Sequence, residues 1–272
     1  MTTVSITAKS VKSFHELWER RTLVYFFVWR DLKSRYQRTF LGVGWILLQP
    51  LLLAAIFAFI ASHRTGLGLV ATDTPVFLIV FLGVSLWQFF ETGLTGAVNS
   101  LGGNYHLLKK VYIPKPLLLL SAIVGRGFDF TLTMVVFMLL LWFTGAPLSV
   151  TGFLLIALAA AMLALTALLF SLLLAPLNVI YHDIGFALPF VMRVMFFATP
   201  LWYALSILPA GTQRLMMFSP IVAAIEMAKS SFVGDSAFAV GKLLPSLMLL
   251  IILAPIAVLV FRRHESTLVD HL

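Results

Sequence analysis

Four charged residues stand inside stretches that are otherwise apolar enough to cross a membrane: Glu91, Arg126, Asp129 and Arg193. Charges at that depth are costly, so by default they are candidates for carrying ions or protons or for binding a polar ligand. Arg126 and Asp129 are three residues apart and share one helix face, so they can pair. A self-neutralised pair packed inside the protein is the simpler interpretation, and a functional role for the pair stays open.

The other two charges have different surroundings. Glu91 comes late in its apolar stretch, one helical turn after Trp87, which predicts a position near the cytoplasmic surface and disfavours a proton relay. Arg193 needs a carboxylate, a carbonyl or a wet cavity, and a partner across a subunit interface is one way to meet that need. Because the sequence has no ladder of acidic residues, a proton-coupled secondary transporter is disfavoured.

Motifs of hydrolytic chemistry are absent from the sequence. It has no G-x-x-x-x-G-K-S/T loop for phosphate, no H-E-x-x-H helix for zinc and no G-x-S-x-G turn. The six histidines are scattered, and His106 and His182 are interpreted as headgroup contacts. There is no cysteine, hence no thiolate metal site. We therefore expect a chain that is not an enzyme, holds no metal or cofactor and does not hydrolyse ATP by itself.

The elements that position these residues are predicted to be membrane spans. Of the 272 residues, 61% are hydrophobic and 11% are charged, whereas a soluble domain has about 25% charged residues. A span needs about 20 mostly apolar residues. This predicts an all-α integral membrane protein with a six-span domain over residues 41–262. The predicted spans cover residues 41–61, 75–98, 117–143, 150–175, 184–204 and 243–261.

Basic residues predict how these spans are oriented. Six spans place both ends of the chain on one side, together with residues 1–40, the turn at 99–116 and the tail at 263–272. Together with Arg262, which directly precedes the tail, these segments carry 13 of the 19 Lys and Arg residues. Because positive charge stays inside, we predict that both termini are cytoplasmic.

The first 40 residues contain a predicted amphipathic helix at 13–38. Tyr25, Trp29, Leu32 and Tyr36 recur at helical spacing on one face, and basic residues lie off that face. Such a helix suits the cytoplasmic membrane interface. A plain membrane anchor and a docking surface for a partner both stay open. The residues assigned to this interface helix are Trp29, Arg30, Lys33 and Arg35.

Residues 205–235 are apolar but broken by proline and glycine. Pro220 divides them into arms of about 13 residues that reach about 20 Å each, whereas the hydrocarbon core is about 30 Å thick. We predict two short re-entrant helices that enter from the periplasmic side and do not cross. They are expected to pack against the fifth and sixth spans, near the outer mouth of a channel.

Aromatic side chains cluster near several span ends. Their faces offer a smooth, uncharged surface over which the apolar faces of sugar rings can slide, although lipid-facing or packed bulk is the commoner role of such residues. The residues predicted to include channel-lining or substrate-contacting positions are Trp45, Trp87, Phe89, Phe196, Phe197, Trp202 and Tyr203.

Three segments, in order along nearly the whole chain, resemble the membrane subunits of type-2 ABC exporters that move polysaccharides, namely the O-antigen, capsule and teichoic acid permeases. The first segment carries Arg35, Tyr36, Leu41, Gly42, Trp45, Gln49 and Pro50. The second runs from Lys109 to Lys115. The third carries Asn178, Asp183, Pro189, Phe190, Thr199 and Pro200, with His182 where the family usually has Arg and Arg193 where a neutral polar residue is common.

This resemblance implies a homodimer in the bacterial inner membrane with a channel at the dimer interface. It also implies two copies of a separate nucleotide-binding subunit, which would hold ATP and magnesium, and a lipid-linked polysaccharide as cargo; nucleic acid is not an expected partner. A short coupling helix between the second and third spans would dock on the ATPase. The residues assigned to it are Tyr105, His106, Leu108, Lys109, Lys110, Tyr112 and Pro114.

The composition of this turn suits a lever. Pro114 and Pro116 fix φ and limit bending of the chain, so movement of the turn passes to the third span. Two alternative functions stay open. One is the same architecture exporting a drug or a smaller lipid. The other is a polytopic membrane enzyme acting on lipid-linked sugar, which would need clustered carboxylates or histidines in its loops.

Overall fold

The computed structural model describes residues 21–37, 42–63, 74–110, 113–146, 149–181, 183–232 and 240–265. Within these ranges every regular element is a helix, which confirms the all-α prediction. Five segments are long and apolar enough to span a membrane. They are α3 (Gly44–His63), α4 (Val76–Gly103), α6 (Lys115–Thr144), α7 (Val150–Ile180) and the segment Gly241–His264, which holds most of α11 (Leu244–Glu265).

The fifth predicted span is shorter than expected. α8 (Asp183–Ala198) has 16 residues, which gives a length of about 24 Å against a hydrocarbon core of about 30 Å. The helix stops where Pro200 follows Thr199, because proline has no N–H and disfavours helical backbone in the residue before it. The prediction of one continuous helix over 184–204 was therefore wrong in its last third.

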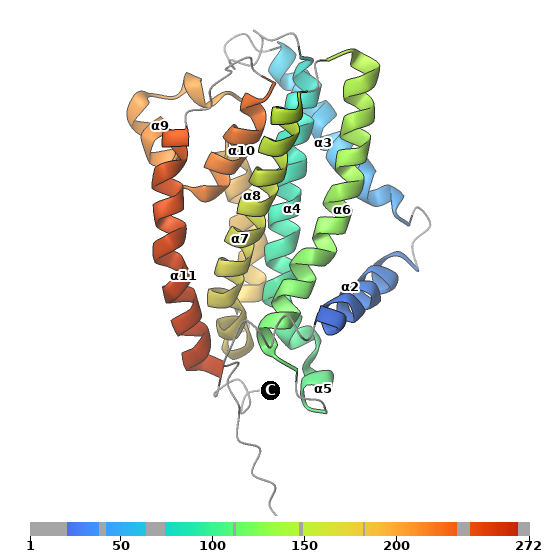
Figure 1. Cartoon of the computed structure of the whole chain (residues 1–272), viewed down its shortest axis with the longest axis vertical. Helices are drawn as coiled ribbons and strands as arrows, with labels where there is room; N and C mark the ends of the chain where they lie inside the picture. The colour runs from blue at the N-terminus through green and yellow to red at the C-terminus, as the bar shows by residue number, and fades with distance from the viewer. Residues whose placement is uncertain are drawn as a thin grey trace, which may run out of the picture.

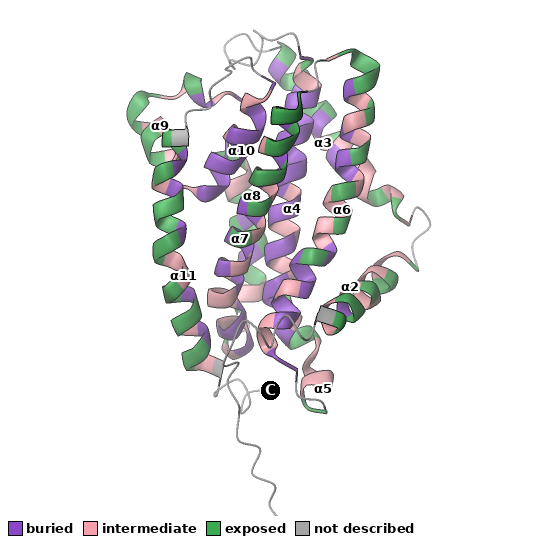
Figure 2. Ribbon diagram, viewed as in Figure 1, coloured by how far each residue is buried: buried purple, intermediate pink, exposed green. Residues whose placement is uncertain are grey.

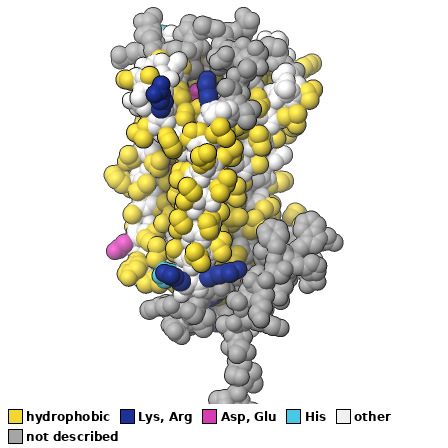
Figure 3. Space-filling view, turned by 60° about the vertical axis from the view of Figure 1, so that its left-hand side comes forward, with side chains coloured by type: hydrophobic (Ala, Val, Ile, Leu, Met, Phe, Trp, Pro, Cys, Tyr) yellow, Lys and Arg dark blue, Asp and Glu magenta, His cyan; other side chains and the backbone are white. Residues whose placement is uncertain are grey.

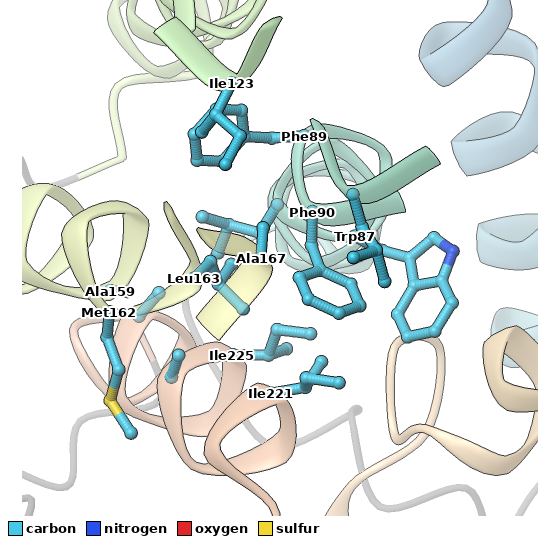
Figure 4. Packing of buried hydrophobic residues seen from close by; sticks show 14 of the residues in the cluster. Trp87, Phe89, Phe90, Ile123, Ala159, Met162, Leu163, Ala167, Ile221 and Ile225 are labelled. Carbon is cyan, nitrogen blue, oxygen red and sulfur yellow. The ribbon is translucent and has the colours of Figure 1, made fainter. Parts of the chain in front are cut away.

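α4 is the central helix of the bundle. It packs against α3, α6 and α7, and Figure 2 shows it buried along most of its length while α11 exposes an outer face. Successive aromatic side chains leave α4 in different directions. Phe89 points toward Ile123 on α6, and Phe90 points toward Ile221 and Ile225 on α10 (Figure 4). One helix thus ties together neighbours on several sides.

The two ends of the bundle carry different elements. α5 (Tyr105–Leu108) and the last turns of α11 lie at one end, with α2 (Arg21–Tyr36) beside the same half of α6, whereas α9 (Ala210–Met216) lies at the other end (Figure 1). On the face turned forward in Figure 3, apolar side chains form a band between two ends at which basic side chains gather. This arrangement suits a membrane-spanning bundle. The orientation with the α5 end in the cytoplasm stays a prediction.

Two short helices occupy the segment predicted to be re-entrant. α9 follows η1 (Leu205–Ile207), and α10 (Pro220–Ser230) begins at the proline that was expected to divide the arms. α10 packs mainly against α7 and α4 and less against α11. Its Lys229 bonds the carbonyl oxygens of Pro200 and Tyr203, which lie in the predicted fifth span, so α10 contacts both expected spans, although α7 and α4 are its main neighbours. The alanines Ala223, Ala224 and Ala228 are fully buried, and small residues of this kind let α10 approach its neighbours closely. η2 (Val240–Leu243) then leads into α11.

Candidate functional site

A cavity of about 310 Å³ lies between α2, α3, α4 and α6. Its walls combine ionisable, amide and aromatic side chains, among them Arg35, Gln49, Gln88, Glu91 and Asp129. Small-molecule sites are typically about 300–1,000 Å³, so this cavity is at the small end of that range. Polar groups at this depth in a membrane protein are expected to face water or a ligand.

Asp129 is the centre of a charge network in this cavity. Its Oδ2 accepts a hydrogen bond from Arg35 Nη1 at 2.7 Å, and its Oδ1 accepts one from the Tyr36 hydroxyl at 2.8 Å. Arg126 Nη1 lies 3.4 Å from the same Oδ2. The predicted pairing of Arg126 with Asp129 on α6 is therefore present, but the basic side chain closest to Asp129 is Arg35 of α2. The network fastens the C-terminal end of the interface helix to α6.

The hydroxyl of Tyr36 has a raised pKa in this environment. Burial raises the pKa of its hydroxyl from 10.0 to about 12, helped by the hydrogen bond to the Asp129 carboxylate and by its negative charge. The nearby arginines Arg35 and Arg126 act in the opposite direction. Tyr36 is therefore protonated, and a hydrogen-bond donor, at every physiological pH. A glycine makes room for this arrangement, because a Cβ at Gly125 would lie 3.2 Å from Arg35 Nη2.

Glu91 lines the same cavity from α4. Its Oε2 accepts a hydrogen bond from Trp87 Nε1 at 2.9 Å. Arg193 on α8 is exposed and interacts electrostatically with Glu91, but no ion pair within 4.0 Å joins Arg193 to a described residue. Glu91 is thus a carboxylate with an electrostatic effect on Arg193, but the two residues form no ion pair. A second partner across a subunit interface stays a prediction.

The turn between α4 and α6 is tied to α2. Asn104 ends α4, and its Oδ1 accepts a hydrogen bond from Arg30 Nη2 at 2.6 Å. In α5 the ammonium group of Lys109 lies over the Tyr105 ring, 4.2 Å from its centroid, and bonds the Tyr105 hydroxyl. His106, Lys109 and Lys110 are exposed. The turn therefore presents cations outward while its back is held by the interface helix.

The remaining residues assigned to the turn divide into two groups. Leu108 is half-buried and packs against the core, and Pro114 is buried immediately before α6, where Pro116 stands in the first turn. The two prolines therefore lie at the junction between the turn and α6, which is the position that the proposed lever would use. Tyr112 lies outside the described residues, as does His182.

The interface helix faces the protein differently from the prediction. Tyr25 and Trp29 are 68% and 59% exposed, as expected for a face that meets lipid. Arg30 and Arg35, which the sequence assigned to the interface helix, bind Asn104 and Asp129. Lys33 remains exposed. The basic side of α2 is therefore partly a protein contact.

The sequence profile of the ABC-2 type transporter family matches residues 22–233, which include α2, the turn and α10. The chain belongs to this family. As an ABC-2 transporter chain it is a multi-pass inner-membrane protein and a transport subunit, and its family implies a partner ABC ATPase.

Several proteins named for O-antigen export or polysialic acid transport are similar to this chain over most of its length. The O-antigen export system permease protein RfbA of Klebsiella pneumoniae is 28% identical over 199 residues, covering 72% of this chain and 74% of the relative. The protein of the same name from Myxococcus xanthus is 29% identical, covering 77% and 78%. The polysialic acid transport protein KpsM of Escherichia coli is 23% identical, covering 74% and 78%.

The aromatic candidates of this ABC-2 chain mostly form one cluster between α3, α4 and the end of α8. Phe57 on α3 stacks on Trp202, with centroids 5.5 Å apart, and contacts Phe196 at the same distance. Phe197 and Tyr203 extend the cluster. The Trp202 Nε1 group is buried and has no hydrogen-bond partner among the described residues.

Exposure separates the predicted channel residues. Trp45 and Phe197 are 53% and 56% exposed, so each has a free ring face. Trp87 is fully buried and therefore offers no surface to a glycan in this conformation. Phe89 is also buried, although its ring edge reaches the cavity and pairs with Phe130 across α4 and α6.

Lys229 is a residue whose place the sequence did not predict. It lies in the segment 205–235 that was predicted to be re-entrant, and it is only 3% exposed. Its ammonium group donates to the carbonyl oxygens of Pro200 and Tyr203, and lies 3.2 Å from Glu226 Oε1. These bonds satisfy carbonyls just after the end of α8. Lys229 thereby pins α10 to the non-helical segment that follows α8, and only its spacing of three from Glu226 hinted at a pairing.

Proposed function

We propose that this chain is the permease subunit of an ATP-driven exporter of a lipid-linked polysaccharide of the O-antigen kind. The observation that carries the proposal is the similarity, over 72–77% of this chain, to permeases named for O-antigen export and polysialic acid transport in three bacterial species. A cargo of this size needs a wide path. We therefore propose a homodimer with a channel at the subunit interface.

ATP and magnesium would be bound by two separate nucleotide-binding subunits, not by this chain. Their proposed docking surface is the turn after α4. His106, Lys109 and Lys110 are exposed there, and the buried residues Ile113 and Pro114 join the turn directly to α6. This proposal also sets the orientation, because a cytoplasmic ATPase requires the α5 end, and with it both termini, to face the cytoplasm.

Trp45 and Phe197 are the proposed channel-lining aromatics, because their rings are exposed on the helices α3 and α8. Replacing each by Leu keeps bulk and removes the flat ring. We expect both variants to export glycan more slowly at unchanged protein level. Trp142→Leu is the matched control, since Trp142 is 75% exposed at the far end of α6 and suits a membrane-interface belt. Normal export by both channel variants would refute the sliding surface.

The function itself is tested by deleting the gene in its native bacterium. We expect the completed glycan to disappear from the cell surface and to accumulate, lipid-linked, on the inner face of the inner membrane. Supplying the chain on a plasmid should restore the surface glycan. A membrane enzyme acting on lipid-linked sugar would instead change the structure of the glycan, and an unchanged surface glycan would refute the proposal.

A further inference from the structure

We propose that the cavity between α2, α3, α4 and α6 is a binding site for a single neutral sugar unit, held within each subunit. This inference rests on the proposed function, because the sugar would be one attached to the lipid carrier. The cavity volume of about 310 Å³ suits one small ring and excludes a length of glycan.

The charge of the lining argues for a neutral ligand. Two arginines, Arg35 and Arg126, face two carboxylates, Asp129 and Glu91, so the charges of these lining residues cancel. Both oxygens of Asp129 are already engaged by basic or hydroxyl donors. A phosphate or diphosphate group favours a surplus of cationic side chains, and the two arginines of this lining are matched by two carboxylates. A neutral ligand leaves the balance undisturbed.

Unused hydrogen-bonding capacity argues for a ligand with many hydroxyl groups. The side-chain amides of Gln49 and Gln88 line the cavity and make no hydrogen bond to any described residue. Glu91 uses one oxygen for Trp87 and presents the other without a bond to the described chain. Each amide offers donors and an acceptor side by side, and the carboxylate offers acceptors. Adjacent hydroxyls on a sugar ring match this pattern.

Aromatic faces complete the wall. Phe89 and Phe130 pair across the cavity lining with ring centroids 5.1 Å apart, and the exposed Trp45 ring faces it from α3. The face of an aromatic ring carries negative charge density, which attracts the C–H groups on the apolar face of a sugar. A few polar groups set among apolar and aromatic walls are typical of small-molecule sites.

The cavity also borders α2, the helix that is bonded to the turn after α4, which is the proposed docking surface for the ATPase. Arg35 and Tyr36, which form one wall, belong to α2. The same helix holds Asn104 of the turn through Arg30 at 2.6 Å. A sugar in the cavity would therefore lie against a helix that is fastened to the coupling turn.

The test uses the absence of native cysteine. Thr92→Cys places a single thiol on the cavity wall, and its labelling by a small methanethiosulfonate reagent is timed in the full permease–ATPase complex in lipid vesicles. The probe is hexyl β-D-glucopyranoside, with hexyl phosphate and 1-hexanol as chain-matched comparisons. At about ten times its dissociation constant, the glucoside should slow labelling about tenfold, while the two comparisons should leave the rate unchanged.

Variants then locate the binding. In the Thr92→Cys background, Gln88→Leu removes one amide and should weaken glucoside binding about tenfold, which reduces the protection to about twofold at the same concentration. Gln49→Leu, on an exposed position of α3, should act in the same direction and guards against misfolding of the first variant. Gln37→Leu is the matched control, because Gln37 is exposed and outside the cavity, and it should keep full protection.

The other outcomes overturn the inference. Equal or stronger protection by hexyl phosphate would make this an anion site, and equal protection by hexanol would make it an apolar chain site. Absence of protection, or full protection in both the Gln88 and Gln49 variants, would remove the sugar from the cavity. Surface glycan is measured separately, so a chain that exports glycan but shows no protection refutes this inference and leaves the proposed function standing.

Discussion

Asp129→Asn should loosen the interface helix from the bundle. The wild-type carboxylate accepts hydrogen bonds from Arg35 and Tyr36 and faces Arg126. An asparagine side chain keeps one acceptor oxygen and turns the other position into a donor. At least one of the three donor groups then loses its partner, and two arginines lose their counter-charge. The tie between α2 and α6 is the contact that should fail.

The size of the effect follows from burial. A hydrogen bond to a charged group is worth about 1.5–3 kcal/mol, and removing one partner of a buried ion pair costs about 3–5 kcal/mol. The Asp129 side chain is 13% exposed and the two arginine side chains are 23% and 28% exposed, so solvent screens part of this energy. We expect a loss of about 2–4 kcal/mol in the free energy that holds α2 closed, after that discount.

The free energy that holds α2 against the bundle can be measured by hydrogen exchange with mass spectrometry on the protein in lipid nanodiscs. Local opening free energies set amide exchange rates, so amides of residues 21–36 should exchange at least tenfold faster, since about 1.4 kcal/mol corresponds to tenfold. α7 should be unchanged. Asp31→Asn is the control, because Asp31 pairs with Arg30 on the surface of α2 itself, and exposed pairs contribute little.

Tyr36 supplies an independent check on the same network. Its pKa, raised to about 12 by burial and by Asp129, should fall toward 10.0 in Asp129→Asn. A folded-state pKa above the unfolded value gives stability that is full below pH 10 and is lost as the pH rises toward 12. The Tyr36 titration is read as the alkaline absorbance difference from the Tyr36→Phe variant. Equal α2 exchange in the Asp129 and Asp31 variants, with an unmoved Tyr36 pKa, would refute the reasoning.

Three further predictions concern the ends of the bundle and its centre. Lys109→Glu combined with Lys110→Glu should reduce the amount of ATPase that co-purifies with the chain, because both lysines are exposed on the turn; wild-type amounts of a stimulated ATPase would contradict it. Gly83→Ala should cost about 1–3 kcal/mol of stability, since its Cβ would lie 3.0 Å from a backbone carbonyl oxygen after α8. Gly102→Ala on the same helix is the control, because its Cβ would meet nothing within 4 Å. Equal melting temperatures of the two variants would contradict the prediction. Ser219→Cys, between α9 and α10, should react with an impermeant thiol reagent added outside spheroplasts, and labelling from the cytoplasm alone would overturn the proposed topology.

Much of the fold was predictable because hydropathy and proline act locally. Runs of about 20 apolar residues produced α3, α4, α6, α7 and α11, and Pro220 marked the start of α10. The failures have equally local causes. Hydropathy continues through residues 199–204, whereas the helix stops before Pro200. The main neighbours of α10, which are α7 and α4, were not predicted, because nine of its 11 residues are buried and the sequence does not say which helix covers each side.

The candidate site was predicted only in part because its partners are distant in sequence. The pairing of Arg126 with Asp129 follows from their spacing along one helix. The shorter bond from Arg35 to Asp129 joins residues 94 apart, and no periodicity connects α2 to α6. Lys229 was missed for the same reason, since its carbonyl partners Pro200 and Tyr203 are 29 and 26 residues away.

These long-range bonds attach α2 to the bundle at two points and so offer a second route from the turn to α6. One route from the coupling turn to the membrane runs through Pro114 and Pro116 directly into α6. The other runs from Asn104 through Arg30 into α2, and from the far end of α2 through Arg35 and Asp129 into the same helix α6. Because both routes converge on α6, we expect a push on the turn to move that helix as a unit. The cavity lies where the second route ends, so a ligand there would lie between the turn proposed to dock the ATPase and the transmembrane helices.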